Sequence, residues 1–231
     1  MSLISREWVT CSSCGRRTLK SGYCMWCGNK LVDREFTSVA PAGDQQAQPP
    51  KTIAFNYVFK VVFLGDIAVG KTSIIKRYAL GQFSPEYFPT FDLTTYSKTL
   101  EYPPIKIDLT IWDTAGGLPE EDKVGPVVTG VDVGVLVFEV SRRSSFNNIP
   151  IYHQIVEKFN PKAHIQVVGN KLDLGFRQVE RSEGEALAAK LGGSYIETSA
   201  TLGTNIDKLF NRNIMECLKN RLDALKKELE G

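Results

Sequence analysis

The first residues that could do chemistry form a glycine-rich segment, GDIAVGKT, at residues 65–72. It follows the apolar strand pattern Val58–Leu64 and precedes a helical pattern. In such a loop the backbone N–H groups can surround phosphates, the lysine can neutralise the outer phosphates, and the threonine hydroxyl can hold magnesium. By itself the segment leaves ATP and GTP equally open, and a glycine-rich structural turn is the alternative. The predicted phosphate-binding residues are Asp66, Ile67, Ala68, Val69, Gly70, Lys71, Thr72 and Ser73.

A second polar segment, WDTAG at residues 112–116, comes directly after the apolar strand pattern Ile105–Ile111. Ligands of mostly parallel sheets bind just beyond the carboxyl ends of the strands. Asp113 is therefore expected beside the glycine-rich loop. Its carboxylate can hold magnesium there, through a water molecule.

A third segment, NKLD at residues 170–173, follows the strand pattern Ile165–Gly169 and is expected at the same edge of the sheet. The carboxylate of Asp173 can accept two hydrogen bonds, from the ring N–H and from the exocyclic amine of guanine. Adenine would leave this carboxylate buried and unpaired, which costs free energy. The segment therefore favours GTP or GDP. The predicted base-pocket residues are Asn170, Lys171, Asp173, Ser199 and Ala200.

Four cysteines near the N-terminus form a separate candidate site. They occur as two pairs of the same pattern, CSSCG at residues 11–15 and CMWCG at residues 24–28. Two such pairs of thiolates can complete a tetrahedral zinc shell, which leaves no open position for water. Disulfides are the alternative, but a cytosolic chain keeps its thiols reduced. Basic residues in this module leave nucleic acid as a less favoured partner. The expected ligands of a structural zinc ion are Cys11, Cys14, Cys24 and Cys27.

A linker divides the sequence into two modules. Residues 37–51 contain Pro, Gly, Gln and Ala but almost nothing to bury, which predicts a flexible tether. The predicted units are a zinc ribbon at residues 1–36, the linker at 37–51, and a nucleotide-binding domain at 52–231 with an extended C-terminal helix. The ribbon has few large apolar side chains, so the metal should supply its folding free energy.

Strand and helix patterns alternate through the second module, which predicts an α/β sheet with helices on both faces. The turn Tyr102–Pro104 predicts one antiparallel hairpin, so the six-stranded sheet should be mixed but mostly parallel. Ser182 with Glu185, and Thr204 with Asp207, predict the starts of two helices. The expected strands are 57–64, 91–100, 105–112, 133–140, 165–169 and 195–198, and the expected helices are 71–80, 151–159, 182–191 and 205–230.

The last helical pattern carries an apolar stripe of leucines at three- and four-residue spacing. A stripe of this kind needs a surface to cover it. The alternatives are its own domain, the zinc ribbon and a second copy of the chain. Cys217 on the same helix is expected to be a buried, unreactive thiol. The stripe consists of Leu218, Leu222, Leu225 and Leu229.

Composition fits a globular protein, with 42% hydrophobic and 23% charged residues. The 28 Lys and Arg exceed the 26 Asp and Glu by two, so net charge does not favour nucleic acid or anionic lipid. No apolar run approaches the roughly 20 residues of a transmembrane helix. The N-terminus lacks an apolar signal core, and the C-terminus has no prenylation box. We expect a cytoplasmic protein with no direct lipid anchor.

The segments GDIAVGKT, PT, WDTAG, NKLD and ETSA resemble, in order and spacing, those of the Ras superfamily of small GTPases. The resemblance is nearest to the Rab and Ras branches and covers about Val58–Leu218. It implies a P-loop NTPase fold with a mixed, mostly parallel six-stranded sheet. It also implies a switch protein that binds GTP or GDP with magnesium and acts through effector and regulator proteins.

The resemblance assigns roles to individual residues. Phe83 would pack on the guanine, and Tyr87 would lie over the phosphates. Thr90 would bind magnesium, with Thr72 and Asp113, when a third phosphate is present, and the N–H of Gly116 would sense that phosphate. Two switch segments, 83–91 and 116–128, would respond to the nucleotide. The catalytic residues by this resemblance are Lys71, Thr90 and Gly116.

Two departures from the family pattern bear on hydrolysis. Gly117 stands where the family has a catalytic glutamine, and the bulky Ile67 stands where many members have a glycine or another small residue. The binding motifs are intact. The sequence therefore predicts a GTP hydrolase with a low intrinsic rate. The alternative is an interaction module that stays loaded with nucleotide and has only vestigial hydrolysis.

Overall fold

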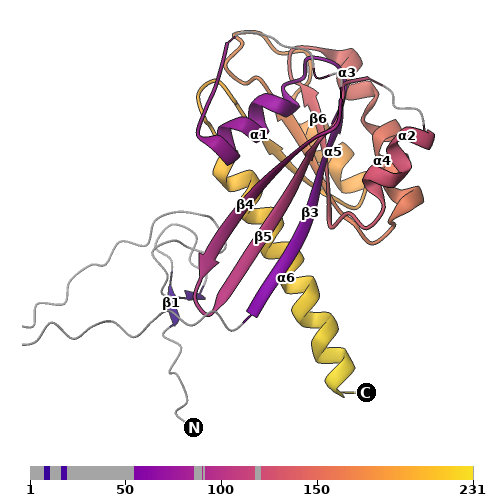
Figure 1. The fold of residues 1–231 in the computed structure, drawn as a ribbon. Coiled ribbons are helices and arrows are strands. Elements are labelled where there is room, and N and C mark those ends of the chain that lie inside the picture. Colours follow the sequence, from indigo (N-terminus) through magenta and orange to yellow (C-terminus); the bar gives the residue numbers. More distant parts are fainter. Residues whose placement is uncertain are drawn as a thin grey trace, which may run out of the picture.

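The computed structural model describes residues 8–10, 17–19, 55–85, 90, 92–117 and 121–230. In this part of the chain six strands form one sheet, in the order β4-β5-β3-β6-β7-β8 (Figure 1). Strand β4 runs antiparallel to β5, and the other neighbours are parallel, which confirms the predicted mixed sheet. The strands are β3 Phe55–Gly65, β4 Thr94–Tyr102, β5 Ile105–Asp113, β6 Val133–Glu139, β7 His164–Asn170 and β8 Ser194–Glu197.

Helices cover both faces of this sheet, as the sequence predicts. Alternate residues of β3 point to opposite faces: Phe63 packs with α1 and α6, whereas Val62 and Leu64 pack with α2, α4 and α5. Each face therefore has its own apolar core. The helices are α1 Lys71–Leu80, α2 Glu121–Val128, α3 Arg143–Asn147, α4 Ile149–Phe159, α5 Arg181–Lys190 and α6 Ile206–Glu230.

The helices α2 and α3 have no counterpart among the sequence-based expectations. Helix α2 contains Gly125 and Pro126, which both disfavour a helical pattern. Gly125 is needed because a Cβ there would lie 2.7 Å from the ring of Phe159 in α4. Helix α3 has five residues, too few for a periodic signal. Packing against neighbouring elements, rather than local pattern, accounts for both helices.

Two predicted helix starts are wrong by one or two residues. Helix α5 begins at Arg181, and the carboxylate of Glu183 accepts the backbone N–H of Glu180 at 2.8 Å. Arg143 in α3 also binds Glu183, so a contact between helices selects this start over the predicted pair at Ser182 and Glu185. Helix α6 begins at Ile206. Thr204 does not start it, because its backbone pairs with Ser199.

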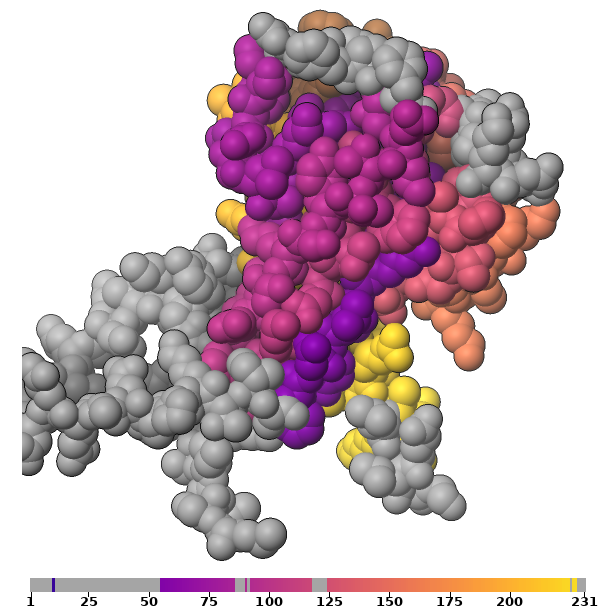
Figure 2. All heavy atoms as spheres, in the orientation of Figure 1, coloured from indigo at the N-terminus to yellow at the C-terminus, as the bar shows by residue number. Residues whose placement is uncertain are grey.

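Strands β3, β4 and β5 lie at the surface on the face shown in Figure 2. Every residue of β4 is at least partly exposed, and Phe55 and Val58 near the start of β3 are about half exposed. The antiparallel turn between β4 and β5 lies at the predicted position, where Tyr102 pairs with Ile105. Among the described residues no helix is long and apolar enough to cross a membrane.

The N-terminal strands β1 Trp8–Thr10 and β2 Arg17–Leu19 pair as an antiparallel hairpin. The cysteine pair at 11 and 14 falls in the sequence between them. All four predicted zinc ligands lie outside the described residues, and so does the linker at 37–51. The zinc ribbon therefore stays a prediction.

Helix α6 packs on the core through its first half. Ile214, Cys217 and Leu218 are buried, and burial raises the pKa of the Cys217 thiol to about 12, as expected for an unreactive thiol. Residues 219–224 are all exposed, Leu222 by 47%. The helix continues past the end of the sheet (Figure 1). The side chains of Leu225 and Leu229 lie outside the described part of the chain.

We expect truncation after Asn220 to leave the free energy of unfolding of the domain within about 0.5 kcal/mol, because exposed side chains contribute little. The ion pair of Arg221 with Asp132, at 3.4 Å, is solvent-exposed and should add almost nothing. Urea unfolding and size-exclusion chromatography of the full-length and truncated chains provide the measurement. A clear loss of stability or a smaller assembly after truncation would show that the end of the stripe has a partner.

Candidate functional site

The glycine-rich loop connects β3 to α1 and has an unusual backbone. Gly65, Ala68 and Gly70 all have positive φ, of 148°, 62° and 95°. A Cβ at Gly65 would lie 2.2 Å from the carbonyl oxygen of Val137, and one at Gly70 would lie 2.3 Å from the side chain of Asn170. Gly70 is the N-cap of α1. The two glycines therefore let the loop lie close against Val137 of β6 and Asn170 of β7 just before α1 begins.

Lys71, the first residue of α1, turns its side chain back under this loop. Its ammonium donates hydrogen bonds to the carbonyl oxygens of Gly65 and Asp66, at 2.8 and 3.0 Å. Burial lowers the pKa of Lys71 to about 8, and the nearby carboxylates of Asp113 and Asp66 oppose this change. The cation is thus held inside the loop, where a phosphate would be its natural counter-ion.

The three predicted magnesium residues meet beside the lysine. The hydroxyl of Thr72 donates to the Asp113 carboxylate at 2.6 Å and lies 2.8 Å from the hydroxyl of Thr90. Because that proton is used on Asp113, Thr90 is the donor to Thr72. The second carboxylate oxygen of Asp113 is buried and has no hydrogen-bond partner among the described residues. Burial raises the pKa of Asp113.

These groups fit a divalent cation. Magnesium prefers oxygen ligands and usually retains several waters, which a carboxylate can hold in place. The buried oxygen of Asp113 that has no hydrogen-bond partner among the described residues could accept a hydrogen bond from such a water. Two threonine hydroxyls and one carboxylate at this position are therefore the chemistry expected of a magnesium site in a nucleotide-binding protein.

The base-binding segments meet at the ends of β7 and β8. Asn170 is buried: its amide donates to the carbonyl of Val69 at 2.9 Å and accepts the hydroxyl of Thr198 at 2.9 Å. The hydroxyl of Ser199 donates to Asp173 at 2.5 Å. Although partial burial opposes it, this hydrogen bond lowers the pKa of Asp173, so the carboxylate is ionised and ready to accept donors.

Lys171 is held beside the base segment by β6. Its ammonium donates to Glu139 at 2.9 Å, and its backbone has a positive φ of 68°. Although burial opposes it, hydrogen bonds from Ser141 and Lys171 lower the pKa of Glu139. The ion pair orients the lysine stem along the base end of the site.

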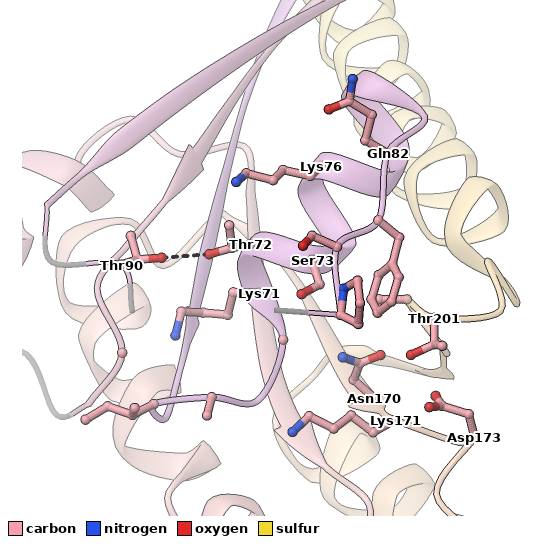
Figure 3. A pocket seen from close by; sticks show the side chains of 18 of the residues that line it. Lys71, Thr72, Ser73, Lys76, Gln82, Thr90, Asn170, Lys171, Asp173 and Thr201 are labelled. Carbon is pink, nitrogen blue, oxygen red and sulfur yellow. Dashed lines mark hydrogen bonds between the residues drawn. The ribbon is translucent and has the colours of Figure 1, made fainter. Parts of the chain in front are cut away.

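A cleft of about 520 Å³ connects the phosphate and base segments (Figure 3). Of the predicted residues, Asp66, Val69, Asp113 and Ser199 do not line the cleft, and Tyr87 lies outside the described residues. The predicted residues that line the cleft are Ile67, Ala68, Gly70, Lys71, Thr72, Ser73, Phe83, Thr90, Gly116, Asn170, Lys171, Asp173 and Ala200.

Six lining residues were not predicted from the sequence. Lys76 stands one helical turn after Thr72 on α1, so the four-residue spacing of a helix could have identified it. Its side chain extends from the same side of α1 as that of Thr72 (Figure 3). Thr201 extends the predicted base segment by one residue. The others come from loops without a periodic signal; the six are Lys76, Gln82, Ser84, Pro85, Ala115 and Thr201.

Asp66 belongs to the loop whose backbone N–H groups are predicted to bind phosphate, and its carboxylate binds Tyr152 of α4 and Asn148 before it. The hydroxyl of Tyr152 donates to it at 2.6 Å, and the amide of Asn148 donates to both oxygens at 3.0 and 3.2 Å. Tyr152 is fully buried, and burial together with Asp66 raises the pKa of its hydroxyl, which therefore stays protonated. Asp66 fastens the loop to the helix layer.

The comparison with known proteins agrees with this arrangement. A sequence model of the Ras family matches residues 60–219, more than half of the chain. The chain belongs to the Ras family. Ras-related protein Rab-42 of Mus musculus is 37% identical over 162 residues, which cover 68% of this chain and 75% of that protein. Ras-related protein Rab-11B of Dictyostelium discoideum is 35% identical over 70% of this chain and 74% of its own length.

A third relative, Ras-related protein SEC4 of Saccharomyces cerevisiae, is 30% identical over 178 residues, 75% of this chain and 80% of that protein. The matched region, residues 60–219, contains the glycine-rich loop and both base segments. The Ras-family protein is therefore a small GTP-binding switch protein and a GTP hydrolase.

We expect Tyr152→Phe to lower the free energy of unfolding by about 1–3 kcal/mol, because it removes a hydrogen bond to a charged group. Urea unfolding of the nucleotide-free protein measures this change. Tyr57→Phe is the control, since the Tyr57 hydroxyl makes no hydrogen bond among the described residues and the change should be neutral. Equal stability of the two variants would show that Asp66 does not depend on α4.

Proposed function

We propose that this Ras-family protein binds GTP and GDP with magnesium and hydrolyses GTP at a low intrinsic rate. In the GTP-bound form it engages effector proteins, and a regulator protein accelerates its return to the GDP-bound form. The observation that supports the low rate is the absence of a side chain at Gly117, whose open side faces Ile67. A Cβ at Gly117 would lie 3.8 Å from two side-chain carbons of Ile67, and the φ of Gly117 is 106°.

Hydrolysis joins the oxygen of a water molecule to the γ-phosphorus and breaks the bond from that phosphorus to the oxygen shared with the β-phosphate. The electron pair stays on the leaving oxygen of GDP, and the water proton goes to the released phosphate. Magnesium, when bound, supplies positive charge to the phosphate oxygens. The residues of the chain position the phosphates: the ammonium of Lys71 and the backbone N–H groups of the loop neutralise charge there.

The rate depends on how well the attacking water is held in line with the leaving oxygen. Gly117 has no side chain that could hold this water. Ile67 is 57% exposed at the mouth of the cleft, so it also occupies space that an arginine from a partner would need. Such an arginine contributes roughly 10³–10⁵ in rate to related enzymes. Gly117 and Ile67 should therefore both lower the rate of GTP hydrolysis.

The second candidate function is a module that stays loaded with nucleotide and recognises partners without turnover. The same two residues favour it, because a site without a water-positioning side chain has little means of leaving the GTP-bound state. Single-turnover hydrolysis of bound GTP separates the two candidates. Release of phosphate within hours indicates a slow switch, and no release indicates a permanently loaded module.

We expect the wild-type chain to release phosphate more slowly than the intrinsic Ras rate of roughly 3–5 × 10⁻⁴ per second. Gly117→Gln alone should help little, because the left-handed backbone at this position disfavours a side chain. Gly117→Gln combined with Ile67→Gly should raise the rate by about 10², the scale of one well-placed catalytic hydrogen bond. Phosphate release from GTP-loaded protein under single-turnover conditions is the measurement.

A glutamate near the start of α2 could orient the water in place of a glutamine. Glu120 lies outside the described residues, and Glu121 opens α2. Replacing both with alanine tests this substitute. A wild-type rate at or above the Ras value that both alanines leave unchanged would contradict the low rate and the glutamate substitute together.

We also propose that residues 1–36 form a zinc ribbon held by the four N-terminal cysteines. The support is the β1–β2 hairpin, whose strands flank the first cysteine pair in the sequence. Zinc sites of this type use cysteine pairs presented on short turns. The ribbon would recognise a partner protein, with nucleic acid the less favoured choice, and the whole chain would act in the cytoplasm.

We expect the purified protein to carry one zinc ion per chain, measured by native mass spectrometry and by release with a chelator. Cys14→Ser should release the metal and unfold the ribbon, because four thiolates are needed to close the shell. GTP binding should persist, since the nucleotide site draws its residues from 65–201. Cys217→Ser is the control that keeps the zinc. Loss of GTP binding in Cys14→Ser would show that the two modules fold together.

A further inference from the structure

Arg142 reaches the glycine-rich loop from the end of β6, the strand that pairs with β3. It stands between β6 and α3, and its guanidinium donates a hydrogen bond to the carbonyl oxygen of Ile67 at 2.7 Å. The contact joins residues 75 positions apart in the sequence. Arg142 lies outside the motifs GDIAVGKT, WDTAG, NKLD and ETSA.

Two cations therefore bind three consecutive carbonyl groups of the same loop. Lys71 holds those of Gly65 and Asp66, and Arg142 holds that of Ile67. The two positive charges repel one another. Burial is the largest cause that lowers the pKa of Lys71, and the charge of Arg142 lowers it further. Lys71 and Ile67 line the cleft, and Arg142 lies next to it through its hydrogen bond to the carbonyl of Ile67. An outer phosphate bound at Lys71 would therefore have a second cation nearby.

The guanidinium has donors that the protein does not use. Glu139 is its acidic neighbour, but the two oxygens of Glu139 already accept hydrogen bonds from Ser141 and Lys171. The Nε of Arg142 is 3.9 Å from Glu139, too far for a hydrogen bond, and it is buried with no partner among the described residues. A buried donor without a partner is costly, so an incoming anion would satisfy it.

The backbone of Arg142 is well fixed. Its N–H donates to the carbonyl of Glu139 at 3.0 Å, and its own carbonyl accepts the hydroxyl of Ser145 at 2.7 Å. It is the N-cap residue of α3, at the edge of the sheet where the parallel strands end. Only the side chain needs to move for the guanidinium to exchange the Ile67 carbonyl for a phosphate oxygen.

We propose that Arg142 binds the γ-phosphate of GTP and stabilises the charge that develops during hydrolysis, as an arginine supplied within the chain. This rests on the proposed function, since it requires GTP to bind in the cleft. As the bond to the leaving oxygen breaks, negative charge grows on that oxygen, where a guanidinium can donate two hydrogen bonds. Ile67 would crowd an arginine from outside, whereas Arg142 already contacts the loop through the carbonyl of Ile67.

The test compares the affinity for GDP with that for GMPPNP, a GTP analogue that is not hydrolysed, by titration with fluorescent forms of both. We expect Arg142→Ala to weaken GMPPNP binding by about 10- to 100-fold, the factor of one or two charge-assisted hydrogen bonds, and to weaken GDP binding much less. Arg142→Gln keeps a donor for the Ile67 carbonyl but removes the charge. It should show the same selective loss.

Arg143→Ala is the matched control, because this adjacent arginine binds Glu183 and Gln178 instead of the loop. It should leave both affinities unchanged. Equal losses for GDP and GMPPNP in Arg142→Ala, with normal binding in Arg142→Gln, would show that Arg142 only braces the loop and would overturn the proposal. Failure of the wild-type chain to bind either nucleotide would instead contradict the proposed function itself.

Discussion

The buried ammonium of Lys71 is the interaction on which the site depends. Taking a cation out of water is costly, and burial brings the pKa of this lysine down to about 8. The loop offsets part of that cost by turning the carbonyls of Gly65 and Asp66 inward. This geometry is possible because Gly65 and Gly70 have no Cβ, which would collide with Val137 and Asn170. A bound phosphate would neutralise the charge of this buried ammonium, so phosphate binding should stabilise the loop.

The sequence predicted most of this arrangement because parallel strands carry their carboxyl ends to one edge. Each candidate segment follows an apolar strand, and strands β3, β5, β7 and β8 do end at the cleft. Thr72, Thr90 and Asp113 lie up to 41 positions apart in the sequence and could be grouped without knowing any contact. Apolar runs and alternating patterns predicted the strands of the sheet, and the glycine spacing predicted the loop. Local patterns thus suffice where topology brings chemically distinct segments together.

Contacts between helices were outside the reach of such patterns. Asp66 belongs to the loop by sequence, yet its carboxylate binds Tyr152 and Asn148, more than 80 residues away. Helix α5 starts where Arg143 holds Glu183, not where a serine would cap it. Helix α2 forms despite Gly125 and Pro126 because it packs against α4. In each case a long-range contact outweighs the local preference, and a single sequence carries no signal for it.

The two unusual residues of the site are physically connected. Gly117 has a left-handed backbone, which costs a residue with a side chain more than it costs glycine, and its open side faces the side chain of Ile67. Gly116, by contrast, must be glycine because a Cβ there would lie 2.5 Å from the Cα of Ile67. The large residue at 67 and the missing side chain at 117 therefore lie side by side and affect the same part of the site. If hydrolysis is slow, as we propose, substitution of one of these two residues should restore little of the rate, because the other residue still affects the same part of the site.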